Sequence, residues 1–365
     1  MDTAVRIVEV LVGLFLIGYV AWDVFNTVAL PRPTPSVYRL ARNLTRWSWA
    51  AWQWQAGRMA LGQRRERFLG AFAPLLILVL LVAWVVFLIV GFGLIDLAYG
   101  TSFRPPITSL GTAFYAAGTG LLTIGFGDIV PTVALTRLIV IVSAGLGLGT
   151  VALVITYLFS LYGSFQRREV LVTTLDARAG APPSGVALLE TSRRTELLGD
   201  LPNLFGDWER WAAEVLDSHL AFPILGYFRS SHDNESWVAS LGAMLDAAVL
   251  VLTTVEDQPR GHAEMLVAIG VHLVEDLASY FGFSNDGRVG VEREEYDTAR
   301  ARLEAAGFGL ENPDIGWILF AQIRARYASR LNALAGFWMT PPALWIGDRE
   351  HDPHHPATSP DVSPG

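Results

Sequence analysis

The chain has 365 residues, of which 52% are hydrophobic and only 17% are charged, and its mean hydropathy is +0.37. This composition argues against a soluble enzyme and indicates a membrane protein. The 35 acidic residues outnumber the 27 basic ones, which are all arginine, and the absence of cysteine excludes disulfides, thiolate metal sites and cysteine nucleophiles.

The uncharged stretches predict three membrane-spanning helices. Residues 71–95 give 25 uncharged positions and residues 138–166 give 29, both above the roughly 20 needed to cross a bilayer. A first span, assigned to residues 1–30, contains Glu9 and Asp23, and it lacks the cleavage site of a signal peptide, so we expect it to be retained. For Asp23 we expect a structural partner from the segment that follows.

Segment 31–70 is rich in arginine and tryptophan, with Glu66 as its single acid. This mixture predicts an interfacial helix that binds anionic lipid. The excess of arginine also places the segment in the cytoplasm, which puts the N-terminus outside and the C-terminal half inside a multi-pass protein of the plasma membrane. Arg39, Arg42 and Arg46 have the spacing of a voltage sensor, but they lie outside any apolar span.

A pore-like loop is predicted within residues 71–168, between an outer helix at 71–97 and an inner helix at 133–166. Pro105 and Pro106 precede a short helix at 108–122, which Thr108 or Ser109 can cap. A helix that ends part-way through the membrane directs its last carbonyl groups inward and favours a cation there. Irregular backbone at that depth must be buried by protein or line a water-filled cavity.

The stretch TIGFGD, at 123–128, suits a cation filter. Gly125 and Gly127 can adopt the positive φ that aims successive carbonyl oxygens at one axis, where they replace the hydration shell of a potassium ion. Ile124 and Phe126 are expected to point away from the axis and pack behind it. The predicted ion ligands are the Thr123 hydroxyl at the inner end and the backbone carbonyl groups of Thr123, Ile124, Gly125, Phe126 and Gly127. Asp128 places a carboxylate at the outer mouth of the filter.

TIGFGD resembles the potassium-channel selectivity filter, commonly TVGYGD, and the order of outer helix, pore helix, filter and inner helix resembles the two-helix pore module of that superfamily. The resemblance covers about residues 75–168 and implies that the backbone of 123–127 coordinates potassium. Phe126 keeps the aromatic ring at the usual tyrosine position. Leu122 and Gly120 stand where the family commonly has threonine or serine, which leaves a non-selective cation channel as an alternative.

One filter strand supplies one side of each carbonyl ring, so the sequence predicts a homotetramer that conducts potassium passively. By resemblance, a glycine of the inner helix, Gly147 or Gly149 more than Gly145, bends at the gate; close helix packing is an equal alternative. The candidates for the bundle crossing are Val154, Tyr157, Leu158 and Leu161. Two further GFG copies are interpreted as helix packing, at 91–93, and as a helix end, at 307–309.

The C-terminal half is acidic. Residues 1–168 carry a net charge of +7 and residues 169–365 a net charge of −15, which argues against a nucleic-acid partner. Apolar periodicity predicts a helical cytoplasmic bundle over 169–345, followed by a disordered tail at 346–365. Asp246 makes residues 237–255 a core helix rather than a fourth span. The expected bundle helices are 208–219, 235–256, 262–281, 291–306 and 315–337.

Together these features predict an all-α membrane protein with three transmembrane helices, a re-entrant pore helix and a helical bundle. No cofactor, no resident metal and no enzymatic activity are expected, because no nucleophile and base arrangement stands out in the acidic half. The ligand of that half is not identified by its sequence. A membrane-anchored sensor or scaffold with a vestigial pore loop is the alternative from a different class.

Overall fold

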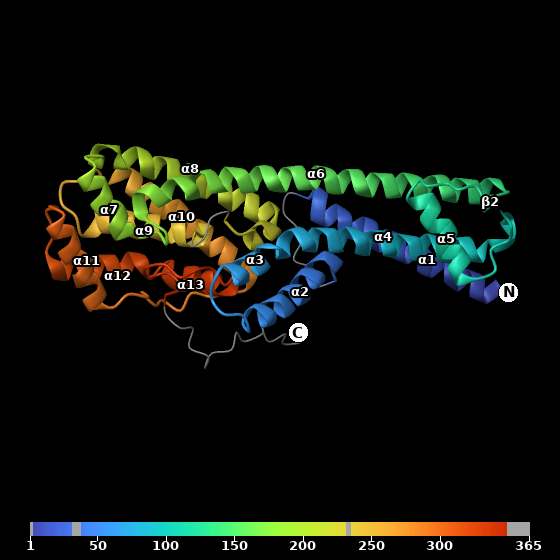
Figure 1. The fold of residues 1–365 in the computed structure, drawn as a ribbon, viewed down its shortest axis with the longest axis horizontal. Coiled ribbons are helices and arrows are strands. Elements are labelled where there is room, and N and C mark those ends of the chain that lie inside the picture. The colour runs from blue at the N-terminus through green and yellow to red at the C-terminus, as the bar shows by residue number, and fades with distance from the viewer. Residues whose placement is uncertain (1–2, 31–37, 231–234, 349–365) are drawn as a thin grey trace, which may run out of the picture. The chain divides into compact units, whose positions relative to one another are not determined.

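A computed structural model describes residues 3–30, 38–230 and 235–348 (Figure 1). The predicted interfacial segment at 31–70 and the predicted tail at 346–365 therefore lie partly outside the described residues. Almost all of the described elements are helices, which confirms the all-α class. The chain divides into two compact units, one of residues 1–59 and 71–162, the other of residues 60–70 and 163–365.

The first unit contains the predicted pore. Its elements are α1 (Thr3–Val24), η1 (Phe25–Ala29), α2 (Leu40–Ala56), α4 (Phe72–Ala98), η2 (Gly100–Ser102), β1 (Phe103–Arg104), α5 (Leu110–Leu121), β2 (Val130–Pro131) and the first part of α6 (Ala134–Ala179). Strands β1 and β2 pair antiparallel, with Phe103 opposite Pro131, so they close the loop between α4 and α6 at its base.

Three helices are long and apolar enough to cross a membrane, within the described residues. They cover Thr3–Ala29, Gln63–Ala98 and Ala134–Ala179. This agrees with the three spans expected from sequence. The helix that contains the third span continues well beyond residue 166, because no proline or glycine interrupts the segment after Arg168 until Gly180, whose φ of +84° ends the helix.

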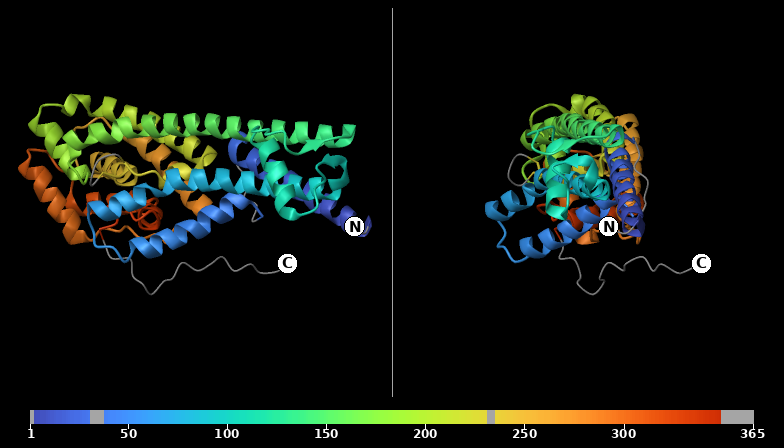
Figure 2. Two further views of the ribbon diagram at one scale, coloured as in Figure 1. Left: turned by 45° about the vertical axis from the view of Figure 1, so that its right-hand side comes forward. Right: turned by 90° about the vertical axis from the view of Figure 1, so that its right-hand side faces the viewer.

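Helices α1 and α4 pack side by side through two glycines (Figure 2). A Cβ atom on Gly13 would lie 2.5 Å from the carbonyl oxygen of Gly91, and one on Gly91 would lie 3.0 Å from that of Gly13. Next to it, a Cβ on Gly93 would lie 2.5 Å from the ring of Phe114 on α5. The GFG at 91–93 is therefore a site of close helix packing, as its sequence context indicated.

The second unit is a helical bundle. It contains α3 (Gln63–Gly70), the end of α6, α7 (Gly185–Arg194), η3 (Leu198–Asp200), α8 (Leu201–Ala221), η4 (Pro223–Tyr227), α9 (Trp237–Thr253), α10 (Gly261–Phe281), α11 (Arg293–Ala305), α12 (Pro313–Arg324) and α13 (Ala328–Phe337). Helix α9 is buried along almost its whole length by α7, α8, α10, α12 and α13. It is a core helix, as Asp246 indicated.

Two features of this bundle differ from the sequence-based expectation. Helix α7 was not anticipated, and the helix expected at 315–337 is two helices, α12 and α13. Between them Tyr327 is fully buried and donates a hydrogen bond from its hydroxyl to Asp246 Oδ1 at 2.5 Å. Asp246 also accepts a hydrogen bond from Arg324 Nε at 2.9 Å. These contacts join residues about 80 positions apart, so the local sequence pattern did not predict the break between α12 and α13.

Candidate functional site

The short helix α5 begins and ends where local chemistry requires. Ser109 is its N-cap, and the serine hydroxyl accepts a hydrogen bond from the Thr112 amide at 3.2 Å. Pro105 and Pro106 lie just upstream and cannot continue a helix in that direction. With 12 residues, α5 is about 18 Å long and does not cross a bilayer. It ends at Leu121, directly before the TIGFG segment.

The TIGFG backbone has positive φ at every second residue. Thr123, Gly125 and Gly127 have φ of 56°, 60° and 78°, whereas Ile124 and Phe126 are not in the left-handed region. Alternation of this kind places successive N–H groups on one side of the chain and successive carbonyl groups on the other. For Thr123, a residue with a side chain, this conformation costs on the order of 1 kcal/mol, and such strain is concentrated at functional sites.

The hydrogen bonds of the TIGFG segment agree with this separation of N–H groups and carbonyl groups onto two sides of the chain. The amides of Ile124 and Gly125 both donate to the carbonyl oxygen of Thr119 on α5, at 2.8 and 3.2 Å. Within the described residues, the carbonyl oxygens of 123–127 accept no hydrogen bond. The amide side is therefore held against the pore helix, and a row of carbonyl oxygens is left available to a cation.

Tyr115 on α5 contacts both ends of the outer part of this segment. Its hydroxyl donates a hydrogen bond to Asp128 Oδ2 at 2.8 Å, and its ring stacks on Phe126 with centroids 6.5 Å apart and planes 5° from parallel. The sequence identified Asp128 and Phe126 but gave Tyr115 only a place on the helix surface. Its place on α5, about two turns before the helix ends, could have indicated that Tyr115 contacts the chain that follows the helix.

The side chains expected to pack behind the filter are largely uncovered in a single chain. Ile124 is 51% exposed and Phe126 is 68% exposed. In the described part of the single chain, these exposed apolar side chains therefore lie beside carbonyl groups that accept no hydrogen bond.

The inner-helix glycines differ in their surroundings. A Cβ atom on Gly147 would collide with the carbonyl group of Leu121, so at this position α6 lies directly against the end of the pore helix. Gly145 and Gly149 have open space where a Cβ would be. Close packing thus accounts for Gly147, and a hinge remains a prediction for the three glycines.

Among the predicted bundle-crossing residues, Val154, Tyr157 and Leu161 are buried and Leu158 is half-buried. Ile155 and Phe159, on a neighbouring face of α6, are 49% and 76% exposed. The predicted bundle-crossing residues thus lie mostly on the covered face of α6 in the single chain. The gate assignment stays a prediction.

Asp23 is fully buried and joins three elements of the first unit. Its carboxylate accepts hydrogen bonds from Trp84 Nε1 on α4 at 2.8 Å and from the Ala41 amide in the first turn of α2 at 3.2 Å. The carboxylate acts as an N-terminal cap for α2, since Arg39 at the N-cap position supplies no side-chain cap. The expected structural partners from the arginine-rich segment are thus the Ala41 amide and the nearby charge of Arg39, and the tryptophan of α4 was not foreseen.

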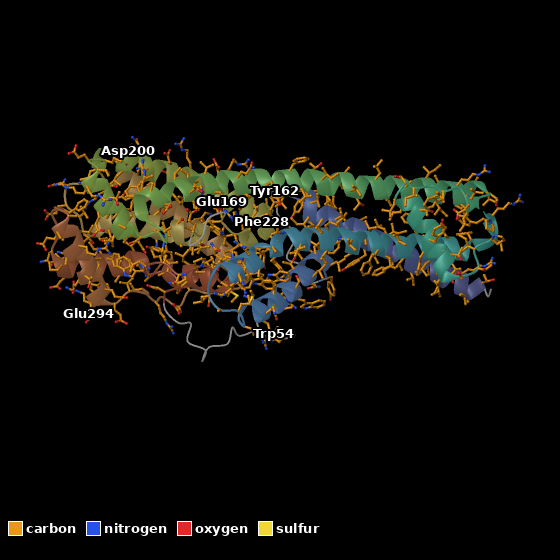
Figure 3. The ribbon with its side chains drawn as sticks, viewed as in Figure 1. Trp54, Tyr162, Glu169, Asp200, Phe228 and Glu294 are labelled. Atoms are coloured by element: carbon orange, nitrogen blue, oxygen red, sulfur yellow. The ribbon has the colours of Figure 1, made fainter. Side chains whose placement is uncertain are left out.

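At the start of the second unit, Arg168 of α6 is buried among polar partners. Its guanidinium donates hydrogen bonds to the carbonyl oxygens of Leu225 and Phe228, both at 2.9 Å, and forms an ion pair with Glu169 at 2.9 Å. Two of these partners, Glu169 and Phe228, are labelled in Figure 3. His219 on α8 lies 3.1 Å from Arg168 Nη1 through its Nε2. Burial, and then the charge of Arg168, hold the pKa of His219 well below its ordinary value. His219 is therefore neutral, with Nε2 as the acceptor.

Comparison with known proteins identifies the part of the chain that resembles ion channels. Residues 74–163 match the sequence profile of a family described as "Ion channel", which covers α4, α5, the TIGFG segment and most of the apolar part of α6. These residues form an ion-channel pore module in a membrane protein, and the resemblance to a two-helix pore module is confirmed.

A bacterial membrane protein is related to this chain over a wider range. Over 207 residues the chain is 25% identical to the "Uncharacterized membrane protein YdjJ" of Bacillus subtilis (strain 168), a region that covers 55% of this chain and 59% of that relative. No solved structure gives a significant match.

Proposed function

We propose that four copies of this chain form a passive, potassium-selective channel whose filter is the backbone of residues 123–127. The observation that carries the proposal is the alternation of φ at Thr123, Gly125 and Gly127, with their carbonyl groups free of hydrogen bonds. One strand presents one side of each carbonyl ring, and a dehydrated potassium ion requires oxygens all around it. The Thr123 hydroxyl and the Asp128 carboxylate complete the inner and outer ends.

The electrostatics of α5 support a cation at this position. Its C-terminus, with the negative end of the helix dipole, immediately precedes Thr123. No charged side chain lies between Ser109 and Gly127, so the backbone itself supplies the negative potential.

We further propose that the channel lies in the plasma membrane with its N-terminus outside and the second unit in the cytoplasm. The arginine excess before α4 supports this orientation. Trp47 and Trp54 of α2 are 64% and 62% exposed, and the Arg58 guanidinium lies 3.3 Å from the centroid of the Trp54 ring. Such an exposed indole and guanidinium surface suits the headgroup layer of an anionic membrane.

The decisive experiment is potassium flux into liposomes that contain the purified full-length protein. We expect flux from the wild type and at least about a tenfold loss in Gly125→Ala, because an alanine at φ +60° costs roughly 1–2 kcal/mol and turns the carbonyl away. Gly18→Ala on α1 is the matched control, since nothing lies within 4 Å of a Cβ at Gly18. It should conduct like the wild type.

Reversal potentials in mixed potassium and sodium test selectivity. A strong preference for potassium supports the proposal, whereas equal permeability would identify a non-selective cation channel, the alternative that Leu122 and Gly120 leave open. Absence of flux from well-folded protein under all conditions would favour a sensor or scaffold with a vestigial loop.

A further inference from the structure

Helix α3 and the segment after η4 contain buried hydrogen-bond donors without acceptors. Arg65 Nε, Arg229 Nη1 and the Ser230 hydroxyl are each buried with no hydrogen-bond partner. All three residues belong to the second unit. Buried polar groups are satisfied in the great majority of cases, and leaving one unsatisfied costs about 1–3 kcal/mol, more when it is charged. Three unsatisfied donors in these two segments indicate that a hydrogen-bond acceptor from a ligand belongs here.

The guanidinium of Arg229 is fixed in place but only partly used. Its side chain is 15% exposed, its Nη2 donates to the Met339 carbonyl oxygen at 2.8 Å, and its Nε lies 3.6 Å from Glu66 Oε2. A Cβ atom at Gly70 would lie 3.8 Å from the Arg229 Cβ, so the arginine abuts the end of α3. The third nitrogen of the guanidinium, Nη1, is held in place by these contacts but donates no hydrogen bond to any described residue.

Positive charge is in excess around these donors. Burial, opposed by Glu66 and reinforced by the neighbouring charge of Arg65, lowers the pKa of Arg229 to about 10. Within the described residues, Glu66 is the one carboxylate that acts on Arg229, and the like charge of Arg65 opposes it. A second negative charge would relieve both the desolvation and the repulsion.

We propose that Arg65, Arg229 and Ser230 form a binding site for a phosphate group. A tetrahedral oxyanion offers several acceptor oxygens to two guanidinium groups and a hydroxyl, which is the geometry in which arginine binds phosphate best. None of its residues belongs to α2, and the proposal does not depend on ion selectivity. Because α3 directly precedes α4 in the chain, phosphate bound here fastens the start of the outer pore helix to the cytoplasmic bundle.

Two sources could supply the phosphate: a free phosphate ion or the headgroup of an anionic phospholipid. The first arm of the test titrates inorganic phosphate into the full-length protein in maltoside micelles, which carry no phosphate, by calorimetry. The second arm places the protein in nanodiscs of phosphatidylcholine with or without phosphatidylglycerol, and native mass spectrometry counts the phosphatidylglycerol retained by the released protein.

The variants are chosen to separate the site from general charge. Arg65→Gln and Ser230→Ala remove one donor each, and we expect about tenfold and about threefold weaker binding. Arg64→Gln is the matched control, because Arg64 is the exposed neighbour on α3 and its loss changes the net charge by the same amount. It should bind within twofold of the wild type. Arg229→Gln is tested only if circular dichroism shows wild-type helicity.

The outcomes decide between the sources. Saturable binding of inorganic phosphate that Arg65→Gln weakens and Arg64→Gln does not supports a soluble ligand. Retention of phosphatidylglycerol with the same pattern, without phosphate binding in micelles, supports a lipid headgroup. Binding in neither arm, or equal losses in Arg64→Gln and Arg65→Gln, overturns the proposal. None of these results depends on whether the pore conducts potassium.

Discussion

At the scale of single residues, the filter segment is shaped by a few backbone angles and one tyrosine. A left-handed φ is natural for Gly125 and Gly127 but not for Thr123. The hydrogen bonds from Ile124 and Gly125 to Thr119 hold that conformation in place. Tyr115 then ties the outer end to α5 through Asp128 and Phe126.

We predict that Tyr115→Phe keeps the fold but loosens the filter mouth. The change removes the donor to Asp128 Oδ2 and keeps the ring that stacks on Phe126. Because the Asp128 carboxylate then loses the contact that holds it beside α5, we expect the permeability ratio of potassium to sodium to fall severalfold. Bi-ionic reversal potentials measure this, with Tyr99→Phe, outside the filter, as the control. An unchanged ratio would show that the bond does not brace the mouth.

At the scale of elements, α2 is attached at both ends to the outer helix of the pore. Asp23 caps its first turn and bonds Trp84, and toward its other end Trp49 and Trp52 lie against Phe72, with ring centroids 4.7 and 5.7 Å apart. Helix α2, which we propose to bind anionic lipid, is thereby joined to α4. In that proposal, this connection links the lipid surface to the outer helix of the pore.

We predict that Asp23→Asn loosens α2. The Trp84 indole and the Ala41 amide both donate to Oδ2 of Asp23, and Oδ1 lies 3.4 Å from the same Ala41 amide. An asparagine that keeps its oxygen toward these donors therefore turns its NH2 group toward the Ala41 N–H, donor against donor. Because Asp23 is buried, an unsatisfied donor there lowers the free energy of unfolding by about 1–3 kcal/mol. Hydrogen exchange of residues 40–56 should accelerate, while the filter segment stays protected. Glu9→Gln, the same chemical change on the same helix, should leave that exchange as in the wild type; equal acceleration would contradict the cap.

At the scale of the whole molecule, the second unit contains a buried histidine, His219, whose protonation state affects its stability. The imidazole of His219 faces Arg168 on α6, which is itself paired with Glu169, and its ring lies 4.9 Å from that of Trp237 on α9. Its Nδ1–H donates to the Val215 carbonyl oxygen at 2.9 Å, so protonation of Nε2 would bring two cations together and cost the Arg168 bond.

We predict that the second unit loses stability as the pH falls below about 6.5. The folded-state pKa of His219 is depressed, so the unfolded chain binds the proton first, and the stability present above 6.5 decreases by at most about 1.4 kcal/mol per pH unit as acid is added. Thermal unfolding of the full-length protein between pH 7 and 5 measures the slope. His219→Gln should flatten it and the exposed His272→Gln should not. Identical slopes in all three would refute the assignment.

Local features of the chain were enough to anticipate much of this architecture. The number of spans follows from apolar run length, the position of α5 from two prolines and a capping serine, and the filter from the spacing of Gly125 and Gly127. Helix boundaries were less accurate where the stop signal is not local, as between α12 and α13, where burial of Tyr327 against Asp246 makes the break.

By itself, then, the sequence determined the membrane class and the pore module, and it located the segment that we propose as the filter, because hydrophobic length and glycine conformation depend on neighbouring residues alone. Only the tertiary structure decided that Asp23 caps α2, that Tyr115 holds Asp128, and that Arg65 and Arg229 are left with unused donors. The partners of buried polar groups come from distant parts of the chain, and the energy that selects them exists only once the helices have packed.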